Sequence, residues 1–183
     1  MEHIVPFITD KLFLKVNQNK TTVSEIKGIK YLGYGFYSRK GEYRLTVHQK
    51  SVAKMKVKLK ELTRSSRGIG NEARKTAIRQ YLRGWINYFV KANMITLMRK
   101  TDGWYRRRIR AIYWTQWKRV RTRHRKLRVL GMPEDFVHSM ANCRKGRWRA
   151  TKMLNRAMTK DWIHKEQGWI SMADYYSEKH KIR

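Results

Sequence analysis

The sequence has few of the features that cross-link a protein or insert it into a membrane. Its 183 residues include one cysteine, Cys143, which excludes an internal disulfide framework and a zinc site built on clustered cysteines. No apolar run approaches the roughly 18 residues of a membrane span, and the N-terminus lacks the basic-then-apolar order of a signal peptide. We therefore expect an intracellular protein with no membrane partner.

Acidic residues are scarce as well. Thirteen Asp and Glu stand against 44 Lys and Arg, which leaves a formal charge of +31 at pH 7. Such an excess repels itself until a polyanion neutralises it, so the composition favours a nucleic-acid partner. Apolar residues make up 41% of the chain and aromatic residues 12%, which is typical of a packed domain and not of a basic disordered tail.

A β-hairpin is predicted near the N-terminus. Residues 4–21 begin helix-like, become extended and end in a polar break, as the tail of a larger unit would. Residues 29–47 hold two runs of β-forming residues around the turn sequence "SRKG". Gly33 and Gly35 lack the following helix that a phosphate-binding loop requires, so we interpret them as positions of close backbone packing or a bulge.

Three helices are predicted after the hairpin, at residues 51–66, 71–92 and 97–118. Ser51 is the candidate cap of the first. Gly84 lies inside the second, where we expect it to permit close helix packing. The predicted apolar stripes are Val52, Met55, Leu59 and Leu62 in the first helix and Ile78, Leu82, Trp85 and Phe89 in the second.

The third helix carries two different faces. Tyr105, Ile109 and Ile112 form an apolar stripe that suits packing against the first two helices. A second face alternates cations and rings, and it fits either additional core with snorkelling arginines or an RNA-binding surface. Its members are Arg106, Arg110, Tyr113 and Trp117, flanked by Arg107 and Trp114.

Basic runs continue beyond this helix. Residues 119–128 contain six Lys and Arg, one His and no acidic residue, and we expect a loop or irregular segment that RNA orders. In "RKGRWR", Trp148 lies among four cations, where it fits equally well as a base-stacking residue or as part of the C-terminal core.

Several segments, in this order, resemble group II intron-encoded maturase/reverse transcriptases. The similarity covers nearly the whole chain. Its motifs are "KYLGYGF", "SVAKMKVKLKELTRSSRGIG", "YLRGWINYF", "WYRRRIRAIYWTQWKR" and "RKGRWRATKMLNRAMTKDWIHKEQGWIS".

This resemblance implies three segments and a fold class. Residues 1–48 would be the end of the reverse transcriptase palm with its hairpin, and residues 49–130 the thumb or maturase-specific (X) domain. Residues 131–183 would be a basic helical segment, which in some members overlaps a DNA-binding region. The expected fold is mainly α: a three-helix thumb-like bundle with a small N-terminal β-hairpin and a C-terminal helical segment.

The carboxylates of the family's polymerases are missing. Their Tyr-Ala-Asp-Asp turn and an earlier aspartate hold two metal ions, and neither motif occurs ahead of the palm-like residues. "MADYY" contains only Asp174, which we interpret as a surface or helix-end residue. Glu134 and Asp135 follow "GMP" and are expected in the first turn of a helix.

Histidine and cysteine do not form a recognisable site either. His138 and Cys143 are too few for zinc, and the Cys-x-x-Cys pairs of the nuclease domain found in many family members are missing. His48, His124 and His164 lie among basic residues, where a solvated or phosphate-contacting role is expected. We predict no catalytic residue, metal ligand or cofactor.

The predicted function is binding of structured group II intron RNA to assist its folding and splicing, without polymerase activity of this chain alone. Two alternatives stay open: one segment of a split or longer reverse transcriptase, or a general nucleic-acid-binding module or decayed retroelement remnant. The expected partner is RNA, with target DNA and a palm-containing chain as further candidates, in a bacterial cytoplasm or an organelle. The predicted RNA-contacting residues are Lys54, Lys58, Arg64, Arg67, Arg106, Arg107, Arg110, Trp117, Arg121, Arg123, Arg125, Lys126, Arg144, Lys145, Arg147, Trp148 and Arg149.

Overall fold

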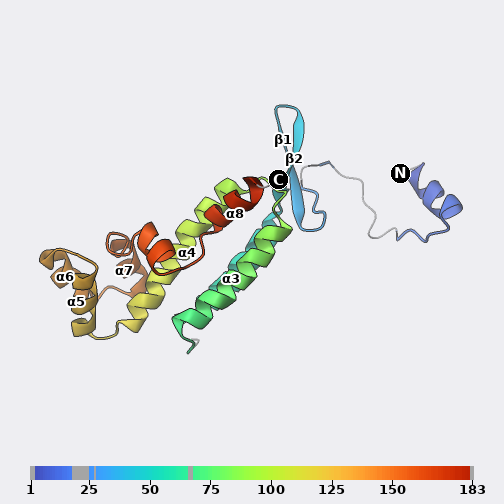
Figure 1. Cartoon of the computed structure of the whole chain (residues 1–183). Coiled ribbons are helices and arrows are strands. Elements are labelled where there is room, and N and C mark those ends of the chain that lie inside the picture. The colour runs from blue at the N-terminus through green and yellow to red at the C-terminus, as the bar shows by residue number, and fades with distance from the viewer. Residues whose placement is uncertain (1–2, 18–24, 27, 66–67, 182–183) are drawn as a thin grey trace.

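The fold is mainly α with one two-stranded antiparallel hairpin, as predicted (Figure 1). A computed structural model describes residues 3–17, 25–26, 28–65 and 68–181. In chain order, the elements are α1 (Ile4–Pro6), the π-helical turn η1 (Phe7–Lys11), β1 (Tyr34–Arg39), β2 (Glu42–Val47), α2 (Gln49–Leu62), α3 (Asn71–Tyr88), α4 (Ile95–Gln116), α5 (Val120–Val129), α6 (Glu134–Ala141), α7 (Arg147–Met153), the π-helical turn η4 (Trp162–Glu166) and α8 (Met172–Lys181).

The hairpin packs closely against the end of α3 through the glycine that precedes β1. Strands β1 and β2 pair from Tyr34↔Val47 to Arg39↔Glu42, so the prediction for this region is confirmed. Gly33 precedes β1, in a turn, with φ of +85°. A Cβ there would lie 3.0 Å from Cζ of Phe89, which confirms close packing at this position.

Helices α2 and α3 pack through the predicted stripes, but the cap of α2 and the role of Gly84 differ from the prediction. His48 caps α2, because its Nδ1 accepts from the backbone N–H of Lys50 at 3.1 Å. Ser51, the predicted cap, donates instead to the carbonyl of Gly33 at 2.9 Å. Gly84 is exposed and has no neighbour within 4 Å of an added Cβ, so the packing role predicted for it is wrong.

The long helix α4 lies at the centre of the molecule, against α7 and α8. Tyr105, Ile109 and Ile112 are buried, as predicted. Tyr113 and Trp117, on the second face, are buried too, at 8% and 6% exposed. This face is therefore additional core, and its interpretation as an RNA-binding surface is corrected.

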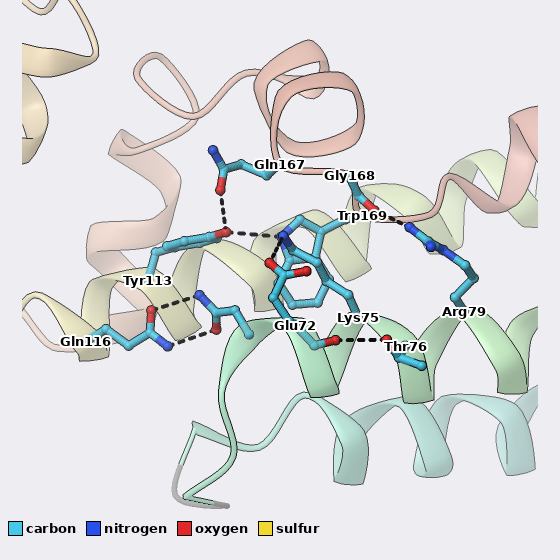
Figure 2. Close-up of polar contacts among 10 residues, drawn as sticks. Glu72, Lys75, Thr76, Arg79, Tyr113, Gln116, Gln167, Gly168 and Trp169 are labelled. Atoms are coloured by element: carbon cyan, nitrogen blue, oxygen red, sulfur yellow. Dashed lines mark hydrogen bonds and ion pairs between the residues drawn. The ribbon is translucent and has the colours of Figure 1, made fainter.

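Residues that follow η4 explain why the second face of α4 is covered. Figure 2 shows Tyr113 and Trp169 facing each other between α4 and the loop before α8. The Tyr113 hydroxyl donates to Oε1 of Gln167 at 2.9 Å, and Nε1 of Trp169 donates to that hydroxyl at 3.3 Å. On the α3 side, Arg79 donates to the carbonyl of Gly168 at 3.0 Å (Figure 2).

The basic run 119–128 is not irregular, because most of it forms helix α5. Leu127 is buried, and α5 packs against the short helix α6. Arg128 and Glu134 form a bidentate pair at 2.7 and 2.8 Å between the two helices. The predicted loop is wrong because one buried leucine and the contact with α6 suffice to fix a short helix whose other residues are mostly charged.

Helix α8 is attached to α4 by a buried carboxylate. Asp102 is 1% exposed and accepts from the backbone N–H groups of Met172 and Ala173 at 3.0 and 2.9 Å, and from the Ser171 hydroxyl at 3.3 Å. Burial raises the pKa of Asp102, against the opposing effect of those two N–H groups. The carboxylate satisfies the otherwise unpaired donors of the first turn of α8.

We predict that Asp102→Ala destabilises the fold by about 2–3 kcal/mol, because it leaves three buried donors without an acceptor. For a chain of this size that corresponds to a Tm lower by about 4–12 °C in a thermal melt followed by circular dichroism. Asp174→Ala, which removes an exposed carboxylate from the same turn, is the matched control and should leave the Tm within about 2 °C. Equal effects of the two substitutions would contradict the role of Asp102.

Candidate nucleic-acid interface

Helix α2 presents lysines on the side opposite its buried stripe. Lys54 and Lys58 are exposed one helical turn apart, whereas Met55 and Leu59 are fully buried. The ammonium of Lys58 lies 2.9 Å from a carboxylate oxygen of Glu61. An exposed pair of this kind contributes little to stability, so Lys58 can exchange Glu61 for a phosphate at small cost.

Helix α5 carries a second group of exposed cations. Arg121, Arg125 and Lys126 point away from the buried Leu127 and are exposed. Arg123 differs from them, because its guanidinium binds within the protein. It donates to the carbonyl of Trp117 at 2.9 Å and lies 4.1 Å from the ring centroid of Trp114. Arg123 is thus a residue that positions α5 on α4 rather than a free cation for RNA.

The start of α7 collects the densest group of cations. We call Arg144, Lys145, Arg147, Trp148 and Arg149 the α7 basic surface, and all five are exposed. Three surface hollows adjoin the α7 basic surface: one beside α5, one beside α2 and one beside Arg107 of α4. Arg147 lines the hollows beside α5 and α2. Lys145 lines those beside α5 and Arg107, and Trp148 lines those beside α2 and Arg107. The α7 basic surface therefore lies where hollows from α2, α4 and α5 meet.

Two predicted RNA-contacting residues of α4 are inaccessible. Arg110 is 5% exposed and donates to the carbonyl of Met158 at 2.9 Å, and burial lowers its pKa to about 10. Trp117 is buried beside Tyr113. Both assignments are corrected: Arg110 is bound by the segment that follows α7, and Trp117 is part of the core.

Of the four remaining predicted residues, the three that the structure describes differ in their exposure. Arg106 is half-buried, and Arg107 donates to the carbonyl of Trp148 at 2.9 Å and so joins α4 to α7. Arg64 is exposed at the end of α2. Arg67 lies outside the described residues.

Two arginines are buried at core positions that the sequence had not been expected to fill with charge. Arg108 is 9% exposed and donates to the Thr63 hydroxyl and to the carbonyl of Lys60 at 3.0 Å, at the C-terminal end of α2. Arg74 is 2% exposed and donates to the carbonyl of Arg64 at 2.8 Å. A signal existed, because Arg74 lies one turn before Ile78 on the α3 stripe, and Arg108 lies between Tyr105 and Ile112 on the α4 stripe.

Carboxylates and histidines do not converge in the described part of the chain, where no three His, Cys, Asp or Glu side chains are placed to share a metal ion. Glu134 and Asp135 start α6 and Asp174 lies exposed in the first turn of α8, as predicted. His164 differs from the prediction: it is half-buried, its Nδ1 lies 2.9 Å from the carbonyl of Trp169, and burial lowers its pKa. Within the same residues, no helix combines the length and apolar character needed to cross a bilayer.

One comparison with known proteins finds a similarity in the central helices. The family model for the group II intron, maturase-specific domain matches residues 52–131, from the first turn of α2 to the turn after α5. The comparison with curated proteins found no match.

We predict that Trp117→Ala lowers the free energy of unfolding more than Trp148→Ala does, because Trp117 is buried in the core and Trp148 lies at the surface. Truncating the buried Trp117 should lower the free energy of unfolding by about 3–5 kcal/mol. Trp148 is 41% exposed and its ring contacts three guanidiniums, so its truncation should cost less, about 1–2 kcal/mol. Chemical denaturation of both variants measures this directly, and a larger loss for Trp148→Ala would reverse the assignment.

Proposed function

We propose that this chain, whose residues 52–131 match the family model for the group II intron, maturase-specific domain, binds structured group II intron RNA and assists its folding and splicing. The family match carries the proposal. The exposed cations of α2, α5 and α7 support it, because they offer phosphate contacts on several helices at once.

The charge balance supports an RNA partner over a protein partner. Even if each of the 13 acidic residues paired with one cation, 44 − 13 = 31 Lys and Arg would keep uncompensated charge. Compact RNA has the complementary property, since folding brings its phosphates close together. A rigid cationic protein surface lowers that repulsion, and thereby favours the folded RNA over extended forms.

The chain alone is proposed not to catalyse polymerisation. The matched domain is the maturase-specific one and not the polymerase domain. Asp174 lies 4.0 Å from Lys160, and Glu134 is paired with Arg128, so these carboxylates are surface partners of cations. By extension from the family, we place the protein in a bacterial cytoplasm or an organelle, and we retain the division at residues 48 and 130 as a proposal.

A second candidate is that the chain works together with a palm-containing reverse transcriptase part. Exposed apolar side chains near the N-terminus favour this candidate: Phe7, Leu12, Phe13 and Leu14 are 56%, 50%, 88% and 59% exposed. Several large, exposed apolar side chains within one short segment are typical of a surface that another polypeptide covers. Co-purification of the tagged chain with a palm-containing protein would support this candidate.

We predict that Lys54→Gln and Lys58→Gln weaken binding to all RNAs alike. Each lost phosphate contact should reduce the slope of log K against log salt concentration by about 0.7–0.9. Lys40→Gln, in the hairpin turn away from these helices (Figure 1), is the matched control and should leave the slope unchanged. Equal changes for all three variants would indicate diffuse charge instead of a defined surface.

Competition binding tests the nature of the partner. At a fixed salt concentration, unlabelled intron RNA should displace labelled intron RNA at lower concentration than tRNA or duplex DNA does. Equal displacement by all three would favour the general nucleic-acid-binding module, and preferred displacement by duplex DNA would contradict the proposal.

We also predict that the purified chain extends no primer on an RNA template with Mg²⁺ or Mn²⁺, because the carboxylates that hold the catalytic metal ions are missing from the sequence. Extension that co-elutes with the chain and requires metal would contradict this expectation.

A further inference from the structure

Trp148 differs from the other tryptophans in the exposure of its ring. The residue is 41% exposed in the first turn of α7, whereas the other six tryptophans are buried or half-buried. It also lies outside residues 52–131, the span that matches the family model. Single exposed apolar residues are common on protein surfaces, so a role for Trp148 has to be argued from its surroundings.

Three guanidinium groups surround the indole ring. The Cζ atoms of Arg147, Arg108 and Arg107 lie 5.1, 5.5 and 5.9 Å from its centroid. Two of these cations are fixed by other contacts: Arg107 donates to the carbonyl of Trp148 at 2.9 Å, and Arg108 to that of Lys60 at 3.0 Å. A ring and cations that are already in place cost less to order when a ligand binds.

Arg147 is the accessible member of the three. It is exposed at the start of α7 and donates to the Ser65 hydroxyl, next to the end of α2. Its charge also lowers the pKa of Arg108, although burial of Arg108 lowers it more. An anion that binds between Arg147 and Arg108 would relieve this repulsion.

A surface hollow of about 690 Å³ opens beside the ring. Val57 of α2 and Ile112 of α4 line it with apolar groups, and the exposed Arg64 adds a cation. Glu61 also lines the hollow, and its carboxylate lies 2.9 Å from the ammonium of Lys58. The volume falls within the range of pockets that hold one small ligand, about 300–1,000 Å³. One nucleotide fits such a space, and a base-paired duplex does not.

We propose that Trp148 and this hollow bind one unpaired nucleotide of the RNA. The base stacks on the indole, and its flanking phosphates contact Arg147 and Arg64. This inference rests on the proposed function, since it assumes that the chain binds RNA, and it adds that looped or bulged nucleotides are preferred over duplex. An apolar protein segment would suit the site less well, because three guanidiniums around one ring favour a ligand that combines a flat π system with negative charge.

The test compares two RNAs, one with and one without an unpaired nucleotide. One carries 2-aminopurine in an unpaired loop, and the other is a fully paired stem of the same length and charge. Wild-type protein should quench the 2-aminopurine fluorescence and bind the looped RNA more tightly. Trp148→Ala should weaken binding to the looped RNA about 5- to 150-fold, with the salt slope nearly unchanged and with little effect on the stem. Tyr43→Ala is the matched control, since Tyr43 is 66% exposed on the hairpin, away from α7 (Figure 1).

Two further variants keep the proposal testable if Trp148→Ala alters the fold. Trp148→Phe retains an aromatic face and should bind the looped RNA within a few-fold of wild type, whereas Trp148→Leu retains apolar packing without that face and should bind as weakly as Trp148→Ala. Equal affinity of the Phe and Leu variants would overturn the proposal. So would a wild-type protein that binds both RNAs with a normal salt slope but without quenching or loop preference, and that result would leave the proposed function intact. Failure of the wild type to bind either RNA would reject the proposed function and, with it, this site.

Discussion

The fold depends on arginine side chains that bind main-chain carbonyls. A chain with 44 cations and 13 acidic residues has few carboxylates to offer its buried guanidiniums. Arg74, Arg108 and Arg110 instead donate to the carbonyls of Arg64, Lys60 and Met158. Because a guanidinium has several donors in a fixed geometry, it can satisfy carbonyls at helix ends and in loops, which have no partner within their own segment. Basic residues, which the proposed RNA binding requires on the surface, thus also stabilise the interior of the fold.

The arginines of helix α4 fall into two groups with different roles. Arg108 and Arg110 bind groups in the interior, whereas the preceding Arg107 joins α4 to the α7 basic surface. The distinction matters for experiments on binding, because neutralising an interior arginine leaves its carbonyl partner unpaired and lowers stability. A loss of RNA affinity in such a variant would then report unfolding instead of a lost phosphate contact.

The sequence predicted the core of the fold well where apolar residues repeat at helical spacing. The stripes of α2, α3 and α4, the hairpin and the acidic start of α6 all follow from local pattern. The burial of Arg110 did not follow, because the carbonyl that it binds belongs to Met158, about fifty residues further along the chain. The burial of Trp117 did not follow either, because the spacing of residues fitted both a buried and an exposed second face. Helix α5 was missed because its position depends on contacts with α6 and α4, and composition alone predicted a loop or irregular segment ordered by RNA.

The candidate site was predictable to a similar extent. Helical phase correctly placed Lys54 and Lys58 on the exposed side of α2, since their neighbours Met55 and Leu59 had to face inward. The surroundings of Trp148 could not be derived, because Arg107 and Arg108 reach it from a helix that precedes it by forty residues. Asp102 lies on the α4 stripe between Met98 and Tyr105, and only the position of α8 explains its presence there.

The separation between Asp102 and Met172, seventy residues, also constrains the order of folding during synthesis. When α4 leaves the ribosome, the ring of Tyr113 lacks its partners Trp162 and Trp169, which follow about fifty residues later, so the nascent chain exposes an aromatic surface for the time needed to translate the intervening segment.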